Sequence, residues 1–289
     1  MTEFEAELKA RRFVQEAGIT QIPVDLSRYL DKVSGKVTLD ALEPDEAGYT
    51  MVTPKGPLIT LNAFDRAARQ RFTQCHEIGH LVLDLPSQHA HGPEWSYAKR
   101  PLNEVCCDVF AAELLLPVTL FLALAKNMPL DFDTVDELRV KFFASREATA
   151  SRLAATAKLA CGYVLSEGGK VQHLVRSPAL RQANAWIARG TALPVGSAAQ
   201  ALRAGTSGLG SESCSGDLWF DGWDDVELIE SSVYIPDYDQ TLTLLHCSDQ
   251  DELDALPRTP AREVAVDEEE ELLKPLDGYP SWSRPRDRR

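Results

Sequence analysis

The 289-residue chain has no apolar run of the roughly 18 residues that a membrane-spanning helix needs. Its first residues also lack the apolar core of a secretory signal, and they read as an amphipathic helix. The six cysteines form no C-x-x-C pair and give no sign of a disulfide framework. These absences predict a cytoplasmic protein without membrane contact, and with no sign of an oligomer we expect a monomer.

Positive charge is missing from one long segment. Between Glu212 and Asp254 there are 13 acidic residues and no Lys or Arg. This segment accounts for nearly all of the formal net charge of −14, so the rest of the chain is close to neutral. The segment would repel DNA and attract a basic protein, whereas the rest of the chain does not exclude nucleic acid.

Hydrophobic spacing and turn residues predict the elements of the first half. They are a helix over 3–17, a short helix after Pro23, two strands within 48–62 around a turn at 53–56, a long helix over 62–84 and a helix over 103–117. Farther on, residues 134–160 read as two helices broken near Ala144 and Ser145. A hairpin over 162–177, helical residues near 178–188 and strands at 232–236 and 241–247 follow. The Gly/Ser-rich segment 205–216 reads as a flexible loop.

The clearest chemical motif is His76-Glu77-Ile78-Gly79-His80 on the long helix. Residues four apart share a helix face, so both imidazoles can bind one cation. Glu77 lies one residue round from His76, where it can act as a general base without binding the metal. Gly79 leaves room for a crossing helix. The motif therefore predicts a zinc-dependent hydrolase, with manganese or iron as alternatives in the cell.

A catalytic zinc needs a third protein ligand and one open position. Glu104 opens the next helix 24 residues after His80, and Asp108 follows it by one turn. We assign Glu104 as the third ligand and Asp108 as the carboxylate that orients a ligating histidine. Glu113, in the same helix, is the rival ligand, although it could equally cap or pair at the helix surface. The alternative for the two histidines is ordinary hydrogen bonding within a helix.

The two segments FTQCHEIGHLVLDLP and NEVCCDVFAAELLLP resemble the ImmA/IrrE family of metallopeptidases. The likeness extends from the first helix through about Leu159, and it departs from the family at Cys107, where Ala is usual. In this resemblance His76, His80 and Glu104 match the metal ligands and Glu77 matches the catalytic base. The part beyond is similar to the third domain of the family's radiation-response regulators.

The resemblance and the composition together give an α+β fold in four parts. We expect a gluzincin-like zinc peptidase domain at 1–130, a helix-turn-helix-like lobe at 131–160, a GAF-like α/β sensor domain at 161–257 and a disordered tail at 258–289. The resemblance also implies the substrate, a helix-turn-helix repressor of the XRE type. Its cleavage would induce a response to radiation or DNA damage.

The sequence leaves two parts of the site open. A gluzincin needs a donor for the oxyanion, and Tyr97, His89 and His91 are candidates in the loop between the two helices. An extended substrate could pair with the strand PLITLN, residues 57–62, that precedes the active helix.

The competing function is a DNA-binding or scaffold regulator with a structural metal. The predicted helix pair at 135–159 carries a net charge of only +2, including Arg146 and Arg152, which is little for binding phosphates. Direct DNA binding is therefore left undecided.

Overall fold

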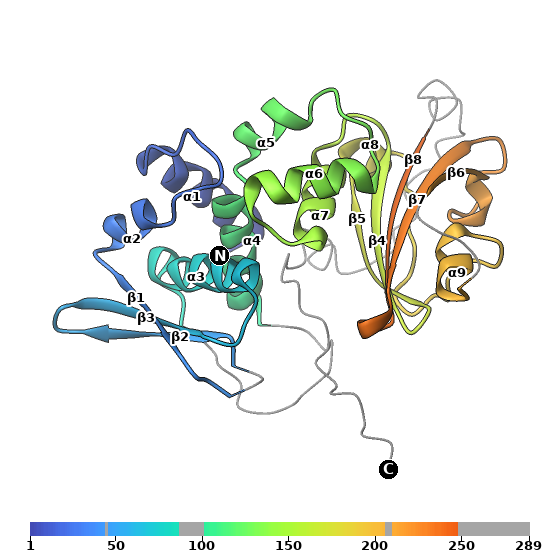
Figure 1. Ribbon diagram of the computed structural model, residues 1–289. Coiled ribbons are helices and arrows are strands. Elements are labelled where there is room, and N and C mark those ends of the chain that lie inside the picture. The colour runs from blue at the N-terminus through green and yellow to red at the C-terminus, as the bar shows by residue number, and fades with distance from the viewer. Residues whose placement is uncertain (44–45, 87–100, 206–209, 248–289) are drawn as a thin grey trace, which may run out of the picture. The chain divides into compact units, whose positions relative to one another are not determined.

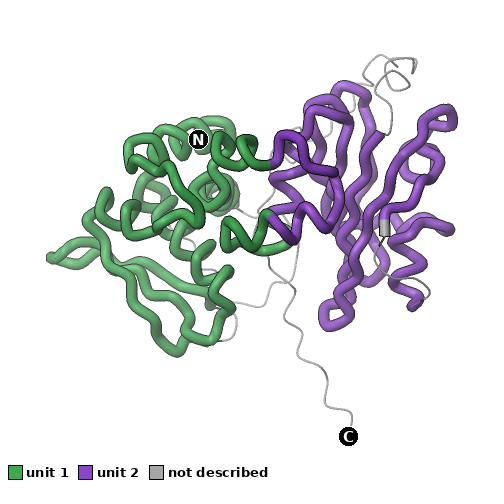
Figure 2. Tube along the Cα trace, turned by 45° about the horizontal axis from the view of Figure 1, so that its top comes forward, with its two compact units in different colours: residues 1–124, 138–148, 272–289 green, residues 125–137, 149–271 purple. Residues whose placement is uncertain are grey.

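The computed structural model describes residues 1–43, 46–86, 101–205 and 210–247 (Figure 1). The fold is α+β, with two separate sheets and helices packed on them. Two compact units divide the chain (Figure 2). Of the described residues, 1–124 and 138–148 form unit 1, and 125–137 and 149–247 form unit 2.

Unit 1 combines a three-stranded sheet with helices. The strand order is β1-β3-β2, with β1 parallel and β2 antiparallel to the central β3. The strands are β1 (Lys36–Asp40), β2 (Gly48–Thr53) and β3 (Gly56–Asn62). The helices are α1 (Glu3–Glu16), α2 (Ser27–Val33), α3 (Ala67–Leu83), α4 (Leu102–Leu115) and all but the last residue of α5 (Val118–Ala125).

Helix α4 is the centre of unit 1. It packs against α3 on one side and α1 on another, and α3 in turn packs against β2 and β3. All ten residues from Cys106 to Leu115 are buried, so this part of the helix has no solvent-exposed face, and the carboxylates of Asp108 and Glu113 are buried among its apolar residues. The Tyr29 hydroxyl donates to the Leu114 carbonyl at 3.0 Å, so a polar group of the core is satisfied there.

Gly48 allows β2 to lie directly against α3. A Cβ atom at this position would lie 2.6 Å from the Thr60 carbonyl oxygen and 2.9 Å from Cγ2 of Thr73 on α3. Both distances are too short for real carbon contacts. The small residue therefore fixes how closely the strand approaches the helix that carries the metal motif.

We expect Gly48→Ala to lower the free energy of unfolding by about 1–3 kcal/mol, because the added methyl overpacks the β2–α3 contact. Met51→Ala, at a half-exposed position of the same strand, is the control and should change stability by less than about 1 kcal/mol. Urea denaturation of both variants measures the difference. A Gly48→Ala protein as stable as the parent would show that the strand can move away at no cost.

Unit 2 is built on a five-stranded antiparallel sheet of order β5-β4-β8-β7-β6. Its strands are β4 (Cys161–Glu167), β5 (Lys170–Arg176), β6 (Gly210–Ser215), β7 (Glu227–Ile235) and β8 (Gln240–Cys247). Helices α8 (Pro178–Gln182) and α9 (Ala198–Arg203) pack on it. The buried Glu230 carboxylate accepts from the Ala199 amide at 2.7 Å and the Trp219 indole at 3.1 Å.

Two helices each contribute residues to both units. The division between units passes through α6 (Phe132–Phe142) and α7 (Arg146–Thr156), which are separated by a turn at 143–145 as predicted. Among the described residues, no single helix is long and apolar enough to cross a bilayer. Helices α4 and α5, bent by 52° to each other, meet that test only as a pair and only by length and composition.

Most predicted elements are confirmed, including the hairpin at 48–62, the two motif helices and the hairpin after residue 160. Two predictions are wrong. Residues 210–215 of the Gly/Ser-rich segment form β6, because pairing with β7 satisfies their backbone groups despite the loop-like composition. Strand β3 is the middle of its sheet, so it has no free edge for a substrate. The predicted tail, 258–289, lies outside the described residues.

Candidate metal centre

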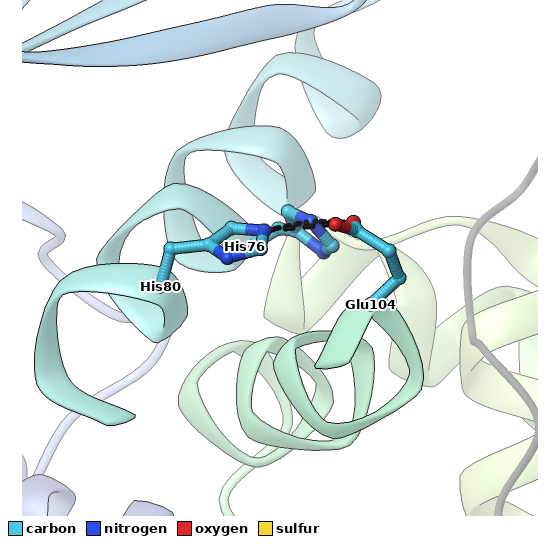
Figure 3. A group of neighbouring side chains, drawn as sticks. All are labelled: His76, His80 and Glu104. Atoms are coloured by element: carbon cyan, nitrogen blue, oxygen red, sulfur yellow. Dashed lines mark hydrogen bonds and ion pairs between the residues drawn. The ribbon is translucent and has the colours of Figure 1, made fainter. Parts of the chain in front are cut away.

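Helices α3 and α4 bring His76, His80 and Glu104 together (Figure 3). The two histidines lie on the α3 face that is turned toward α4, and Glu104 lies in the first turn of α4. His76 Nε2 is 3.0 Å from His80 Nε2 and 3.1 Å from Glu104 Oε2, and His80 Nε2 is 3.5 Å from the same oxygen.

These separations are those of ligands around one small cation. Ligand atoms at about 2.0–2.1 Å from a tetrahedral zinc ion lie about 3.3 Å apart, close to the three distances here. Two imidazoles and one carboxylate also match the three-ligand set of a catalytic zinc site. The residues present therefore fit a metal ion.

The hydrogen bond at Nδ1, the ring nitrogen away from the ligand group, fixes the tautomer of each imidazole. Nδ1 of His76 is 2.7 Å from Asp108 Oδ1, and Nδ1 of His80 is 3.2 Å from the carbonyl oxygen of Leu85. A carboxylate and a carbonyl accept hydrogen bonds, so both Nδ1 atoms must donate. In the neutral rings both Nε2 lone pairs then point to one place, an arrangement that a cation stabilises.

The turn at the C-terminal end of α3 positions the Leu85 carbonyl that His80 contacts. Asp84 ends the helix in the left-handed conformation, with φ +54°, and the amide of Leu85 returns to the His80 carbonyl at 3.1 Å. This turn also brings the Leu85 carbonyl within reach of the His80 ring. Pro86 predicted the end of the helix, but no sequence signal predicted this backbone acceptor.

The electrostatics of the site favour positive charge. Burial alone would lower the pKa of His76, but the Asp108 carboxylate, with Glu104 and Glu77, raises that pKa to about 10. Without metal the imidazole therefore holds a second proton at neutral pH. A bound cation takes the place of that proton.

Close approach of the two helices holds the ligands at this spacing. A Cβ at Gly79 would lie 3.3 Å from both Cα and the carbonyl oxygen of Cys107 on α4, so the helices touch where α3 has no side chain. Burial raises the pKa of the Cys107 thiol, so the cysteine that departs from the family pattern stays a neutral packing residue.

Glu77 lies beside the ligand group and is not part of it. Its side chain is 1% exposed, and its Oε2 accepts a 2.7 Å hydrogen bond from the hydroxyl of Thr50 on β2. Thr50 could not be predicted from the sequence, because its contact with Glu77 joins two elements 27 residues apart and depends on their packing.

The other predicted residues have different positions. Glu113 is buried on α4 and accepts from the Val118 amide at 3.0 Å, so it caps the start of α5, and it is absent from the ligand group. Tyr97, His89 and His91, the candidate oxyanion donors, lie outside the described residues.

We expect Asp108→Asn to weaken zinc binding about 10–100-fold, because an amide no longer fixes the His76 tautomer by charge. Asp84→Asn, which removes a charge from the exposed end of α3 and tolerates the left-handed conformation, should change affinity by less than about twofold. Competition with a chromophoric chelator measures both. Equal loss in the two variants would mean that only net charge matters.

The part of the chain that holds this site matches a known family. Residues 36–154, which run from β1 into α7, match the model of the IrrE N-terminal-like domain. This match supports the likeness of the domain to the ImmA/IrrE family. The match suggests a metal-dependent peptidase or a regulator built on such a domain, and the group His76, His80 and Glu104 could hold its metal.

Solved structures extend the likeness beyond this domain. A Mycobacterium tuberculosis transcriptional regulator superposes with a TM-score of 0.54 at 13% identity, over 89% of this chain and 92% of that one. At this identity the match shows a shared fold across both units. No protein with a curated description matches the chain.

Proposed function

We propose that the ImmA/IrrE-type domain is a gluzincin-type zinc endopeptidase. His76, His80 and Glu104 would bind the metal, and Glu77 would be the general base. The supporting observation is the convergence of three ligand atoms within 3.5 Å of one another, with both histidine Nδ1 atoms occupied by acceptors. Zinc is favoured by two imidazoles with one carboxylate, and manganese is the alternative.

Glu77 supplies the proton transfers in this mechanism. Zinc in the site would act as a Lewis acid that polarises the scissile carbonyl and lowers the pKa of the attacking water. The Glu77 carboxylate takes the proton from that water and then delivers it to the leaving amine. Its burial and its hydrogen bond to Thr50 keep the carboxylate beside the ligand group without joining it. We retain Tyr97 as the candidate oxyanion donor.

Strand β2 replaces β3 as the proposed substrate-binding edge. It is the terminal strand on its side of the described sheet, and its Thr50 reaches the catalytic carboxylate. An extended peptide that pairs with β2 would therefore lie close to Glu77.

The proposed substrate is a helix-turn-helix repressor of the XRE type, whose cleavage induces a radiation or DNA-damage response. The match to the IrrE N-terminal-like domain supports this proposal. The sheet of unit 2 would form a GAF-like sensor at 161–257, and α6 with α7 would form the helix-turn-helix-like lobe at 131–160. The acidic segment from Glu212 onward would attract the basic repressor.

The test is to incubate the zinc- or manganese-loaded protein with XRE-type repressors from the same genome. We expect one repressor to yield a single defined pair of fragments, and chelation of the metal to abolish the cut. Intact repressors in every reaction, with metal bound at one equivalent, would refute the protease proposal.

The alternative, a DNA-binding regulator, is disfavoured by α7. Residues 148–154 are buried in succession, including Arg152 at 5% exposure, so two helical turns have no exposed face for a DNA groove. Arg152 therefore cannot make the phosphate contact considered for it. Its replacement by Glu would destabilise the fold rather than test DNA binding.

A further inference from the structure

The hydroxyl of Thr50 contacts the carboxylate that would serve as the base. The distance from Thr50 Oγ1 to Glu77 Oε2 is 2.7 Å, and the hydroxyl must donate because a carboxylate accepts. Among the described residues, Thr50 is the hydrogen-bond donor found for this carboxylate. Hydrogen bonds to a charged acceptor are among the stronger ones in proteins.

The contact is held by two regular elements in register. Gly48 brings β2 against Thr73 on α3, as described above. Thr50 lies two residues farther along the strand, about 6.6 Å, and Glu77 lies four residues farther along the helix, about 6 Å. The distance from Gly48 to Thr50 along the strand matches the distance from Thr73 to Glu77 along the helix. The close contact at Gly48 therefore places the Thr50 hydroxyl beside the Glu77 carboxylate. Gly48 pairs with Leu61 and Thr50 with Ile59 in the sheet, and both partners are buried.

We infer that Thr50 is a positioning residue that holds Glu77 in its catalytic orientation, an inference that rests on the proposed peptidase function. A glutamate side chain has several rotatable bonds, and without a donor its carboxylate can swing away from the water or into the open metal position. A misplacement of about 1 Å is enough to slow a reaction severely. The β2 strand thus contributes to catalysis by orienting the base, in addition to any pairing with substrate.

Three variants separate positioning from structural support. Thr50→Val removes the hydroxyl with little change of shape, and Thr50→Ser retains it. Thr53→Val is the matched control, because the Thr53 hydroxyl donates within the β2–β3 hairpin, to the Gly56 carbonyl at 2.7 Å.

The substrate for kinetics is the repressor that the metal-loaded parent protein cleaves. With this substrate, Thr50→Val should lower kcat about tenfold or more while KM stays within about twofold. Thr50→Ser should recover most of the rate, Thr53→Val should keep it, and all three should bind one zinc. A parental kcat in Thr50→Val, or no recovery with Ser, would overturn the inference.

A crystal structure of zinc-loaded Thr50→Val gives a readout that needs no substrate. We expect the Glu77 carboxylate to leave its position by more than about 1 Å or to occupy several orientations. An unmoved carboxylate overturns the inference whatever the activity. A displaced carboxylate in a protein whose parent cuts no repressor supports the positioning role and counts against the peptidase proposal alone.

Discussion

Glu77→Gln is expected to lower the rate of repressor cleavage by about 10²–10⁴-fold while zinc remains bound. Glutamine keeps the size of the side chain and an oxygen that can accept from Thr50, so the β2–α3 contact survives. It cannot take a proton from water. Since Glu77 is not in the ligand group, metal content should stay at one equivalent.

The measurement is single-turnover cleavage with matched metal analysis and thermal unfolding. The same variant separates the two functions. A DNA-binding or scaffold regulator with a structural metal would be unaffected, because fold and metal are both retained. A full biological response in cells that carry Glu77→Gln would therefore refute the peptidase proposal, and loss of the metal would mean that Glu77 is a ligand.

Local sequence predicted the site residues to the extent that they depend on helix geometry. His76 and His80 face the same way because they are four residues apart on a helix, and this holds wherever the helix packs. Asp108 follows Glu104 by one turn for the same reason. The structure brings the two pairs together through the Gly79–Cys107 contact, which the sequence indicated only as a small residue at the right place.

The contributions from outside the two helices could not be predicted in this way. Thr50 and the Leu85 carbonyl reach the site through the packing of β2 on α3 and through a left-handed turn after the helix. Neither Thr nor a backbone carbonyl has a distinctive sequence pattern. A glycine at position 48 was the available signal for the first, but its meaning depends on knowing which helix lies against the strand.

The wrong fold predictions have the same origin. β1 is exposed at all five positions, so its alternating Val37 and Leu39 are not explained by burial, and its parallel pairing with β3 decides its conformation. That pairing makes β3 central and removes the substrate edge expected there. β6 is likewise a strand through its partner β7 and not through its Gly/Ser-rich composition.

The second large effect is expected on zinc affinity, and it distinguishes Glu104 from Glu113 as the third ligand. Glu104→Gln should weaken zinc binding by more than about a hundredfold, beyond the range typical of residues that only orient a ligand. The neutral amide is a poorer ligand, and Glu104 Oε2 lies within 3.5 Å of both Nε2 atoms. The helix itself should persist, because the residue lies in its first, partly exposed turn.

Glu113→Gln is the matched control, since it removes the same charge from the same helix. Its carboxylate caps α5 through the Val118 amide, so its loss should cost about 1–3 kcal/mol of unfolding free energy and leave zinc affinity within about threefold. Chelator competition measures the zinc affinity of each variant, and urea denaturation measures its free energy of unfolding. Glu104→Gln should lose affinity and keep its stability, whereas Glu113→Gln should lose stability and keep its affinity. If affinity instead falls with Glu113→Gln and survives Glu104→Gln, the metal takes its third ligand from the middle of α4, and the first turn of the helix is free to contact substrate.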